Sequence, residues 1–506
     1  MAKATSRRQF LVDSGKLALG ATLGSSVFGA AACGPGSSSS PLISPQAWKE
    51  LARKISGQVL LPADPDYLAT ALPNNLRYAP RLPAGIAKCL NANDVAQSIR
   101  WSRQHGIPLI ARSGGHSYAG YSTTRGLMID LTAINRVEFD PGTGIITLGG
   151  GIRNTTLYPA LQAANATITH GRCTGVGGAA FVLGGGVGFN MRRFGLACDQ
   201  MIETELVTAN GSIVTANATE NPDLFWACAG AGGGNLGINT QFKLQTFPVS
   251  DVTVFKITWT SDPENVYSAL IPALQAGPAT LGTRVALNAV TPHQLASGED
   301  VSIRLIGQLV GAPAELAEIL APAYEVAAPS TATIQETAYW PAQIDFLSEP
   351  GLPNRYQETS SFFVGPPSAQ AIDTAFSWAR RWPGTSERAG MIMFQTGAQV
   401  NAVAPDATAF VHRNSDWLMT LALDWGKDDS DALVQKNLDW QADFYSAMRQ
   451  FTTGAYVNFV DPSLMSWQAD YYGSNLSRLR SIKATVDPHQ VFRFPESIRP
   501  GRTPAT

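Results

Sequence analysis

Two glycine-dense segments each carry one side chain that could bond to an electrophilic ligand. The first, Arg112-Ser113-Gly114-Gly115-His116-Ser117-Tyr118, offers an imidazole, and the second, Gly171-Arg172-Cys173-Thr174-Gly175-Val176-Gly177-Gly178, offers a thiol. Glycine lets backbone N–H groups approach a bulky anionic ligand and turn through positive φ without steric cost. No Cys-x-x-Cys or His-x-x-x-His spacing accompanies them, so they indicate attachment to a cofactor, and we expect no metal site.

Alternating strands and short helices surround these two segments. A helix capped by Asn93 precedes a buried strand at 107–111, and the His116 segment follows that strand directly. This alternation indicates an α+β module. The further elements predicted here are strands at 126–131 and within 136–151, a helix at 157–165 before the Cys173 segment, and a hairpin over 202–215 that turns at Asn210-Gly211.

Beyond residue 246 the pattern changes to longer alternating strands separated by helical stretches. Residues 253–260, 301–311 and 418–425 alternate in the manner of half-buried strands. They predict a second domain, over 247–455, in which an antiparallel sheet carries helices on one face. The tail is predicted to form a helix after Tyr471, a turn at Asp487-Pro488 and a closing strand that ends near Ile498.

Size and charge narrow the range of partners. With 506 residues, of which 44% are hydrophobic, the chain is long enough for two or more domains with deep cores. The formal net charge is −2 and the sequence pI is near 6.3. Because no long basic run occurs, nucleic acid is not an expected partner. No stretch has the roughly 20 strongly apolar residues that span a bilayer.

The first 33 residues have the pattern of an export signal. Ser6-Arg7-Arg8-Gln9-Phe10-Leu11 is a twin-arginine motif, and a weakly apolar stretch follows over 17–32. Cys33 then precedes a Gly/Ser-rich linker over 34–46, as in a lipoprotein whose cysteine is acylated. Ala30 stands where such signals usually carry leucine, so simple cleavage with release is the alternative. We expect export by the twin-arginine route, either to the cell surface or periplasm as a lipoprotein or to the exterior.

Cysteine usage is sparse, with five in the whole chain. If Cys33 is lipidated and Cys173 holds a cofactor, three remain. Cys198 and Cys228 could pair after export, and Cys89 would stay free, but their spacing does not decide this.

Five motifs in order resemble those of the berberine bridge enzyme-like oxidases, in the vanillyl-alcohol oxidase superfamily. Besides the two glycine-dense segments they are residues 221–226, residues 407–413, and a C-terminal series at 456–461, 471–473 and 487–488. The resemblance implies a two-domain α+β fold of that superfamily. Its parts would be an FAD-binding domain of the PCMH type over 47–246, built from two α+β subdomains, a substrate domain over 247–455, and a segment over 456–506 that returns to the FAD-binding domain.

The resemblance also implies one FAD, bound covalently by both His116 and Cys173. Attack by Cys173 requires a thiolate, so we expect Arg172 or nearby N–H dipoles to lower its pKa. Ala179 and Ala180 replace glycines of the family pattern, which leaves the second bond open. The glycine run over 183–188 is interpreted as a flavin wall, because a dinucleotide fingerprint needs a strand-then-helix setting and a following acidic residue. The remaining expected flavin contacts are Arg112, Ser113, Gly114, Gly115, Ser117, Gly120, Val176, Gly177, Gly178, Gly184, Gly188, Gly237, Ile238 and Asn458.

Tyr118 and Tyr456 are the expected catalytic pair. Taken alone, tyrosines more often line cores with the hydroxyl at a rim, but in the resembled family the matching tyrosines face the substrate. A phenol with a pKa of about 10 needs help to act as a base near neutral pH, and no acidic or basic neighbour is identifiable from the sequence. Gln395 is the expected substrate-facing polar residue, and Phe459 replaces a commoner tyrosine.

These expectations combine into an exported FAD-dependent oxidase. It would pass a hydride from an alcohol of a sugar, oligosaccharide or glycosylated natural product to flavin, with O2 as the final acceptor and H2O2 as a product. Val176 stands where the family places an oxygen gate, and its small side chain favours O2. The alternatives are a flavin dehydrogenase with another acceptor, a nicotinamide-linked dehydrogenase, and an inactive cell-surface binding lipoprotein. Contact with a membrane is expected only through a lipid anchor at Cys33.

Overall fold

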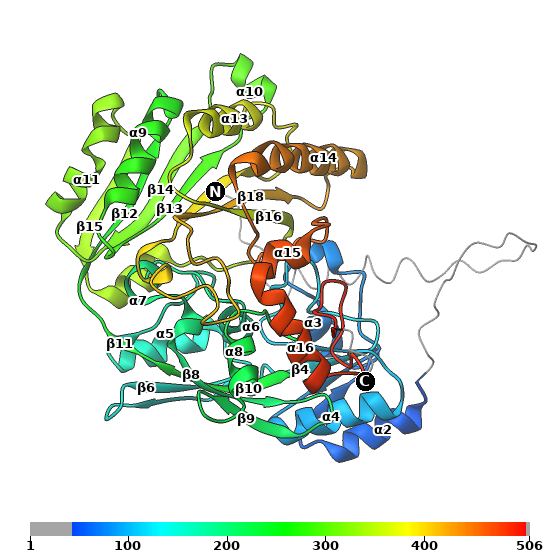
Figure 1. Ribbon diagram of the computed structural model, residues 1–506. Helices are drawn as coiled ribbons and strands as arrows, with labels where there is room; N and C mark the ends of the chain where they lie inside the picture. The colour runs from blue at the N-terminus through cyan, green and yellow to red at the C-terminus, as the bar shows by residue number, and fades with distance from the viewer. Residues whose placement is uncertain (1–42, 502–506) are drawn as a thin grey trace, which may run out of the picture.

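The computed structural model describes residues 43–501, and Figure 1 shows their arrangement. The twin-arginine motif, Cys33 and most of the predicted linker lie outside the described residues. The described chain has a two-domain α+β fold, with two mixed α/β layers at one end and a large antiparallel sheet at the other. Within residues 43–501, no helix has both the length and the apolar character needed to cross a membrane.

The first layer is a four-stranded sheet that ends at the His116 segment. Its central strands are parallel, and a helix connects two of them, because parallel neighbours require a crossover. That helix is capped by Asn91, whose side chain accepts from the Asp94 N–H at 3.0 Å, so the predicted cap at Asn93 is wrong by two residues. In order across the sheet the strands are β1 (Gln58–Leu60), β2 (Gly85–Lys88), β4 (Leu127–Asp130) and β3 (Leu109–Arg112), with α2 (Pro45–Lys54) and α4 (Ala92–Gln104) beside them.

The second layer is a five-stranded antiparallel sheet whose connections carry the Cys173 segment. The predicted hairpin around Asn210-Gly211 is confirmed as the pairing of β8 with β9. Short helices follow the cysteine and the next glycine run. The strands in order are β5 (Val137–Asp140), β6 (Ile145–Gly149), β10 (Ile238–Gln245), β8 (Met201–Val207) and β9 (Ile213–Asn217), and the helices are α5 (Asn154–Ala163), α6 (Gly178–Leu183), α7 (Met191–Phe194) and α8 (Pro222–Cys228).

The third sheet has seven strands, all antiparallel, and helices cover one of its faces (Figure 1). Its side chains alternate, so Met391 and Met393 pack under the helices while Ile392 and Phe394 point to the opposite face. In order the strands are β15 (Thr331–Thr337), β12 (Val252–Trp259), β14 (Ser302–Leu309), β13 (Leu281–Asn288), β17 (Ala389–Gln395), β18 (Trp417–Trp425) and β16 (Arg355–Phe363), and the covering helices are α9 (Pro263–Ala276), α11 (Pro313–Val326), α13 (Ala369–Ala379) and α14 (Asp431–Met448).

The C-terminal segment returns to the first half of the chain through α15 (Trp467–Tyr472) and α16 (Leu476–Val486). The predicted closing strand is wrong, because residues 487–498 contain no strand. Side chains form hydrogen bonds here with backbone groups that a strand partner would otherwise bind. Lys483, fully buried, donates to the carbonyls of Asn235 and Phe492 and to the Asp487 carboxylate, which also accepts the Phe492 N–H.

The cysteines of the described chain are all free thiols. Cys198 and Cys228, which the sequence left as a candidate pair, are each buried and do not form a disulfide. The Cys198 thiol lies 3.5 Å from an Asp199 carboxylate oxygen, and Cys228 accepts from the Asn239 amide at 3.5 Å. Cys89 is buried beneath the first sheet.

Candidate active site

A cavity of about 650 Å³ lies between the glycine-dense segments and the uncovered face of the seven-stranded sheet. We call residues 112–118 and 171–178 the loop wall, and the cavity-facing residues of β13, β16, β17 and β18 the sheet wall. Three predicted contacts, Gly120, Gly178 and Gly184, do not line the cavity. The predicted residues that line it are Arg112, Ser113, Gly114, Gly115, His116, Ser117, Tyr118, Cys173, Val176, Gly177, Gly188, Gly237, Ile238, Gln395, Tyr456 and Asn458.

Glycine is required in the loop wall where its two segments cross. A Cβ on Gly114 would lie 2.3 Å from the Gly177 backbone nitrogen, and a Cβ on Gly177 would lie 2.2 Å from the Ser113 hydroxyl. A Cβ on Gly175 would likewise lie 2.8 Å from His116 Nε2. The absence of side chains at these positions therefore lets the imidazole segment and the thiol segment meet.

The three glycines that do not line the cavity shape the packing around it. A Cβ on Gly120 would lie within 2.3 Å of the Tyr78 ring, and φ at Gly120 is +69°. Gly178 begins α6 against Ile152, and Gly184 accommodates the side chain of Asn458. Their predicted contact with flavin is replaced by contact with neighbouring protein groups.

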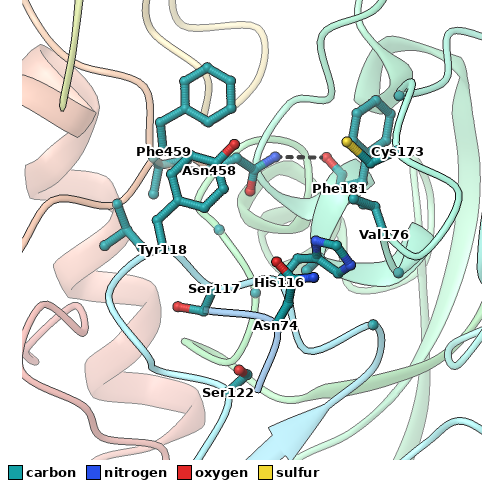
Figure 2. Close-up of a pocket in the computed structure, with 18 of the residues that line it drawn as sticks. Asn74, His116, Ser117, Tyr118, Ser122, Cys173, Val176, Phe181, Asn458 and Phe459 are labelled. Atoms are coloured by element: carbon teal, nitrogen blue, oxygen red, sulfur yellow. Dashed lines mark hydrogen bonds between the residues drawn. The ribbon is translucent and has the colours of Figure 1, made fainter. Parts of the chain in front are cut away.

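His116 and Cys173 both lie close to Gly351, and Figure 2 shows their side chains among those that line the cavity. A Cβ on Gly351 would be 3.3 Å from His116 Cε1 and 3.6 Å from Cys173 Sγ. Burial, reinforced by Arg153 and Arg112, lowers the pKa of His116 to about 4. The imidazole is therefore neutral near pH 7, which leaves a nitrogen lone pair available for bonding.

The surroundings of Cys173 differ from the sequence expectation. Burial is the main cause of a raised thiol pKa, Glu349 adds to it, and Arg172 opposes it only in part. Arg172 forms an ion pair with Glu349, so much of its charge is compensated before it reaches the thiol. The predicted lowering of the Cys173 pKa is thus wrong for the protein groups alone.

The acidic neighbour that the sequence did not reveal is Glu358, on β16. Its carboxyl lines the cavity next to the Tyr118 phenol, with which it interacts, and accepts from Thr420 Oγ1 at 3.1 Å. Burial raises the pKa of Glu358, and burial together with Glu358 raises that of Tyr118. The Tyr118 ring stacks on Phe459, with ring centres 5.1 Å apart (Figure 2). It also contacts Tyr356 edge-on.

Tyr456, the other predicted catalytic tyrosine, uses its hydroxyl within the protein. That oxygen accepts the Gly186 N–H at 2.9 Å and the Asn458 amide at 3.0 Å, and burial raises the Tyr456 pKa. The Asn458 amide also donates to the Phe181 carbonyl, the bond drawn in Figure 2. Tyr456 therefore lines the cavity with its hydroxyl tied to the backbone that follows α6, unlike the Tyr118 hydroxyl, which meets a carboxyl.

Gln395 does not present its amide to the cavity. The amide nitrogen donates to the Leu274 carbonyl in α9, and the amide oxygen accepts from Thr283 at 2.8 Å. Leu274 belongs to a helix on the covered face of the sheet. The predicted substrate-facing role of Gln395 is corrected accordingly, and the cavity-facing neighbour is Phe394.

The sheet wall also carries charged residues that the sequence analysis did not select. Arg388 Nε pairs with Asp424 Oδ2 at 2.9 Å, and Arg284 lies over the Phe394 ring, 5.6 Å from its centre. Both arginines line the cavity. The available signal was Arg284, the single charged residue among the mostly apolar residues of Leu281–Asn288, because charged side chains are rarely buried without a partner.

The class of protein follows from comparisons with known proteins. Residues 83–217 match the family described as FAD binding domain, and residues 455–499 match that described as berberine and berberine like. YgaK, an FAD-linked oxidoreductase of Bacillus subtilis, is 31% identical over 457 residues, which covers 89% of this chain and 98% of YgaK. The xylooligosaccharide oxidase of Thermothelomyces thermophilus is 29% identical over 474 residues, covering 86% and 90%.

A solved structure gives the same fold. The glucooligosaccharide oxidase from Acremonium strictum, described with a 6-S-cysteinyl, 8α-N1-histidyl FAD, aligns with a TM-score of 0.79 at 26% identity, covering 89% of this chain and 98% of that one. The protein described here is an FAD-linked oxidoreductase with a vanillyl-alcohol oxidase-type fold. More narrowly, the chain belongs to the berberine bridge enzyme-like family of FAD-linked oxidases.

The residues present fit FAD. The cavity extends from His116 and Cys173 to a part that is lined by Gly234, Ile238 and Phe494. Three buried polar atoms of residues that line it have no hydrogen-bond partner among residues 43–501, namely the Ser113 hydroxyl, Nε of Arg284 and one oxygen of Glu496. Unpaired buried polar atoms are costly, so a ligand with hydroxyl and phosphate groups would satisfy them.

Proposed function

We propose that the protein is an FAD-dependent oxidase that oxidises an alcohol group of a sugar-like substrate, with its flavin bonded to both His116 and Cys173. The observation that carries this proposal is the pairing of the two walls across one cavity. A neutral imidazole and a thiol lie on the loop wall, and the Tyr118 phenol of the same wall lies next to the Glu358 carboxyl of the sheet wall. Bound FAD would supply the hydride acceptor.

The protein groups would manage the proton. The Tyr118 hydroxyl takes the proton of the substrate hydroxyl and passes its own to Glu358, the carboxyl that lies next to it. Thr420 holds the carboxylate by donating to Oε1. Burial keeps water from competing for these bonds, which strengthens them. Phe459 and Tyr356 fix the Tyr118 ring from two directions, so the phenol is oriented before substrate arrives.

A sugar-like alcohol is supported by the relatives, which include a xylooligosaccharide oxidase and a glucooligosaccharide oxidase. We propose O2 as the electron acceptor, with hydrogen peroxide as product, because Val176 presents only a small side chain to the cavity. A dehydrogenase that uses another acceptor is the second candidate. Turnover in air and under argon separates them, since the oxidase consumes O2 and forms peroxide in equal amounts.

Export by the twin-arginine route remains part of the proposal. It is supported by the Arg7-Arg8 motif, because that route carries folded proteins with cofactors already inserted. Whether Cys33 is then acylated would follow from the mass of the mature protein isolated from its own host.

The test of the double attachment is acid precipitation followed by intact mass measurement. We expect a yellow pellet heavier than the peptide by one FAD. His116→Ala and Cys173→Ala should each keep the added mass, and only the double variant should release flavin on denaturation. A colourless pellet of bare peptide mass from the unmodified protein would contradict the attachment and remove the main support for the oxidase.

A further inference from the structure

Arg284 is a cation in the cavity without a protein partner. Its side chain leaves β13 on the uncovered face of the sheet, lines the cavity and lies over the Phe394 ring. It makes no hydrogen bond or ion pair with any residue of 43–501, and its Nε is buried and unpaired. Arginine is rarely buried without an anion, since removing its charge from water is costly.

The nearby carboxylates are already engaged. Glu349 pairs with Arg172, and Asp424 pairs with Arg388. Glu358 is held by Tyr118 and Thr420. It also stands three strands away from Arg284, since β17 and β18 lie between β13 and β16, which is about 14 Å between backbones at the usual strand spacing.

Arg284 remains charged in this setting. Burial and the positive charge of Arg172 lower its pKa to about 10, with Glu349 and Glu358 acting in the other direction. The group is therefore protonated at neutral pH and has five N–H donors to offer. A planar guanidinium pairs with a carboxylate or a phosphate through two parallel hydrogen bonds.

We propose that Arg284 binds a carboxylate of the substrate, so that the oxidised alcohol belongs to an acidic sugar of the uronic acid type. This inference rests on the proposed function. The apolar Phe394 ring beneath the guanidinium and the acidic residues of the same cavity, among them Glu349, Glu358 and Asp424, favour a single negative charge. A dianionic phosphate would be repelled more strongly by these acidic residues than a singly charged carboxylate, because like charges repel in a desolvated site.

The test compares sugars that differ only in the carboxylate. Digalacturonate and galactobiose, and glucuronic acid and glucose, are given to the holoenzyme, and peroxide formation yields kcat and KM. We expect the acidic member of at least one pair to have a kcat/KM about 10- to 100-fold higher, which matches a charged hydrogen-bonded pair. Arg284→Met should remove this preference, mainly by raising KM for the acid, so that the acidic and neutral members of the pair approach the same kcat/KM.

Arg284→Lys keeps the charge without the planar pair of donors and should give an intermediate preference. The matched control is Arg304→Met. Arg304 lies on the same face of the neighbouring strand β14, but it is exposed and does not line the cavity, so its loss should leave the preference unchanged. Flavin content and melting temperature verify that each variant is folded.

Binding is also measured without turnover, by titrating digalacturonate against the flavin absorption spectrum. An acidic sugar that binds and loses affinity in Arg284→Met supports the inference even if it is not oxidised. Neutral sugars that equal or exceed acidic ones in both assays overturn it while leaving the oxidase in place. If galactose 6-phosphate binds more tightly than glucuronic acid, the assignment of a carboxylate is wrong. Failure of every alcohol to reduce the flavin contradicts the proposed function instead.

Discussion

The loop wall of the cavity consists mainly of backbone, whereas the sheet wall consists of charged and aromatic side chains. At the crossing of Gly114 with Gly177, backbone atoms occupy the space where any side chain would begin. The side chains opposite them extend from strands of the sheet. Arg284 lies on β13, which is paired on both sides, and Glu358 and Tyr356 lie on the edge strand β16. The shape of the loop wall thus depends on the absence of side chains at its glycines, and the chemistry of the sheet wall depends on its charged and aromatic side chains.

Substitutions in the two walls should therefore have different effects. A substitution in the loop wall moves backbone, so it should disturb cofactor attachment and stability together. A substitution in the sheet wall changes charge within a rigid antiparallel frame, so it should change turnover while the flavin stays attached. Cofactor attachment and turnover should therefore respond to different substitutions, and each measurement below follows one of these two quantities.

The largest effect is expected for Glu358→Gln. The amide keeps the size of the carboxyl but cannot receive a proton from Tyr118, so kcat/KM should fall by about 10²- to 10⁴-fold, the usual contribution of a positioned base. Flavin content should equal that of the unmodified protein. Glu387→Gln, on an exposed turn, is the matched control and should change neither quantity. A Glu358→Gln variant with near-normal turnover would exclude the carboxyl as the proton acceptor.

A smaller loss is expected for Gly114→Ala, on the other wall. The new methyl group would lie 2.3 Å from the Gly177 nitrogen and 2.7 Å from the Gly175 carbonyl oxygen, so backbone must move. Overpacking of this kind costs about 1–3 kcal/mol. We expect a lower melting temperature and less than half of the normal flavin content. Gly501→Ala, where the nearest atom would be 3.7 Å away, is the control. Full flavin loading of Gly114→Ala would mean that the loops can separate at no cost.

The same contrast explains what the sequence could predict. Glycine spacing around His116 and Cys173 predicted the loop wall, because a missing side chain is visible in the sequence itself. Alternation predicted β12, β14 and β18 to within one or two residues. Glu358 could not be found in this way, because only the fold brings it from β16 to Tyr118, 240 positions earlier in the chain.

Gln395 shows how little separates a correct prediction of facing from a wrong one. Side chains on a strand alternate, so a shift of one position exchanges the two faces. Phe394 faces the cavity, whereas Gln395 borders the cavity but directs its amide to the helices. Nothing local in the segment 389–395 distinguishes these two assignments, since both faces carry apolar side chains. The closing strand after Asp487 failed for a related reason: hydrogen bonds from Lys483 and to Asp487 satisfy backbone groups that a strand partner would otherwise have to satisfy.

A moderate effect is expected in the pH dependence of kcat/KM. The base must be ionised to accept a proton, and burial raises the pKa of Glu358 above its ordinary value of 4.5. Activity should therefore be lost on acidification at a higher pH than an exposed glutamate would give, and should be regained as the pH rises through that pKa. Asp424→Asn removes a nearby negative charge that helps to raise this pKa, so it should move the acid limb to lower pH. An acid limb at or below 4.5 would indicate that another group limits the reaction.

The smallest effect on turnover is expected for Tyr456→Phe, and the contrast with Tyr118→Phe sharpens the assignment of the base. The Tyr456 hydroxyl accepts the Gly186 N–H and the Asn458 amide, so its removal leaves a buried N–H unpaired at a cost of about 1–3 kcal/mol. This cost appears as a lower melting temperature, while kcat/KM changes by less than about tenfold, because no carboxyl is attached to that phenol. Tyr118→Phe removes the hydroxyl that meets Glu358 and should reduce kcat/KM by nearly as much as Glu358→Gln. If Tyr456→Phe were the more damaging of the two, the Tyr456 hydroxyl, and not the Tyr118 hydroxyl, would be the group that takes the substrate proton.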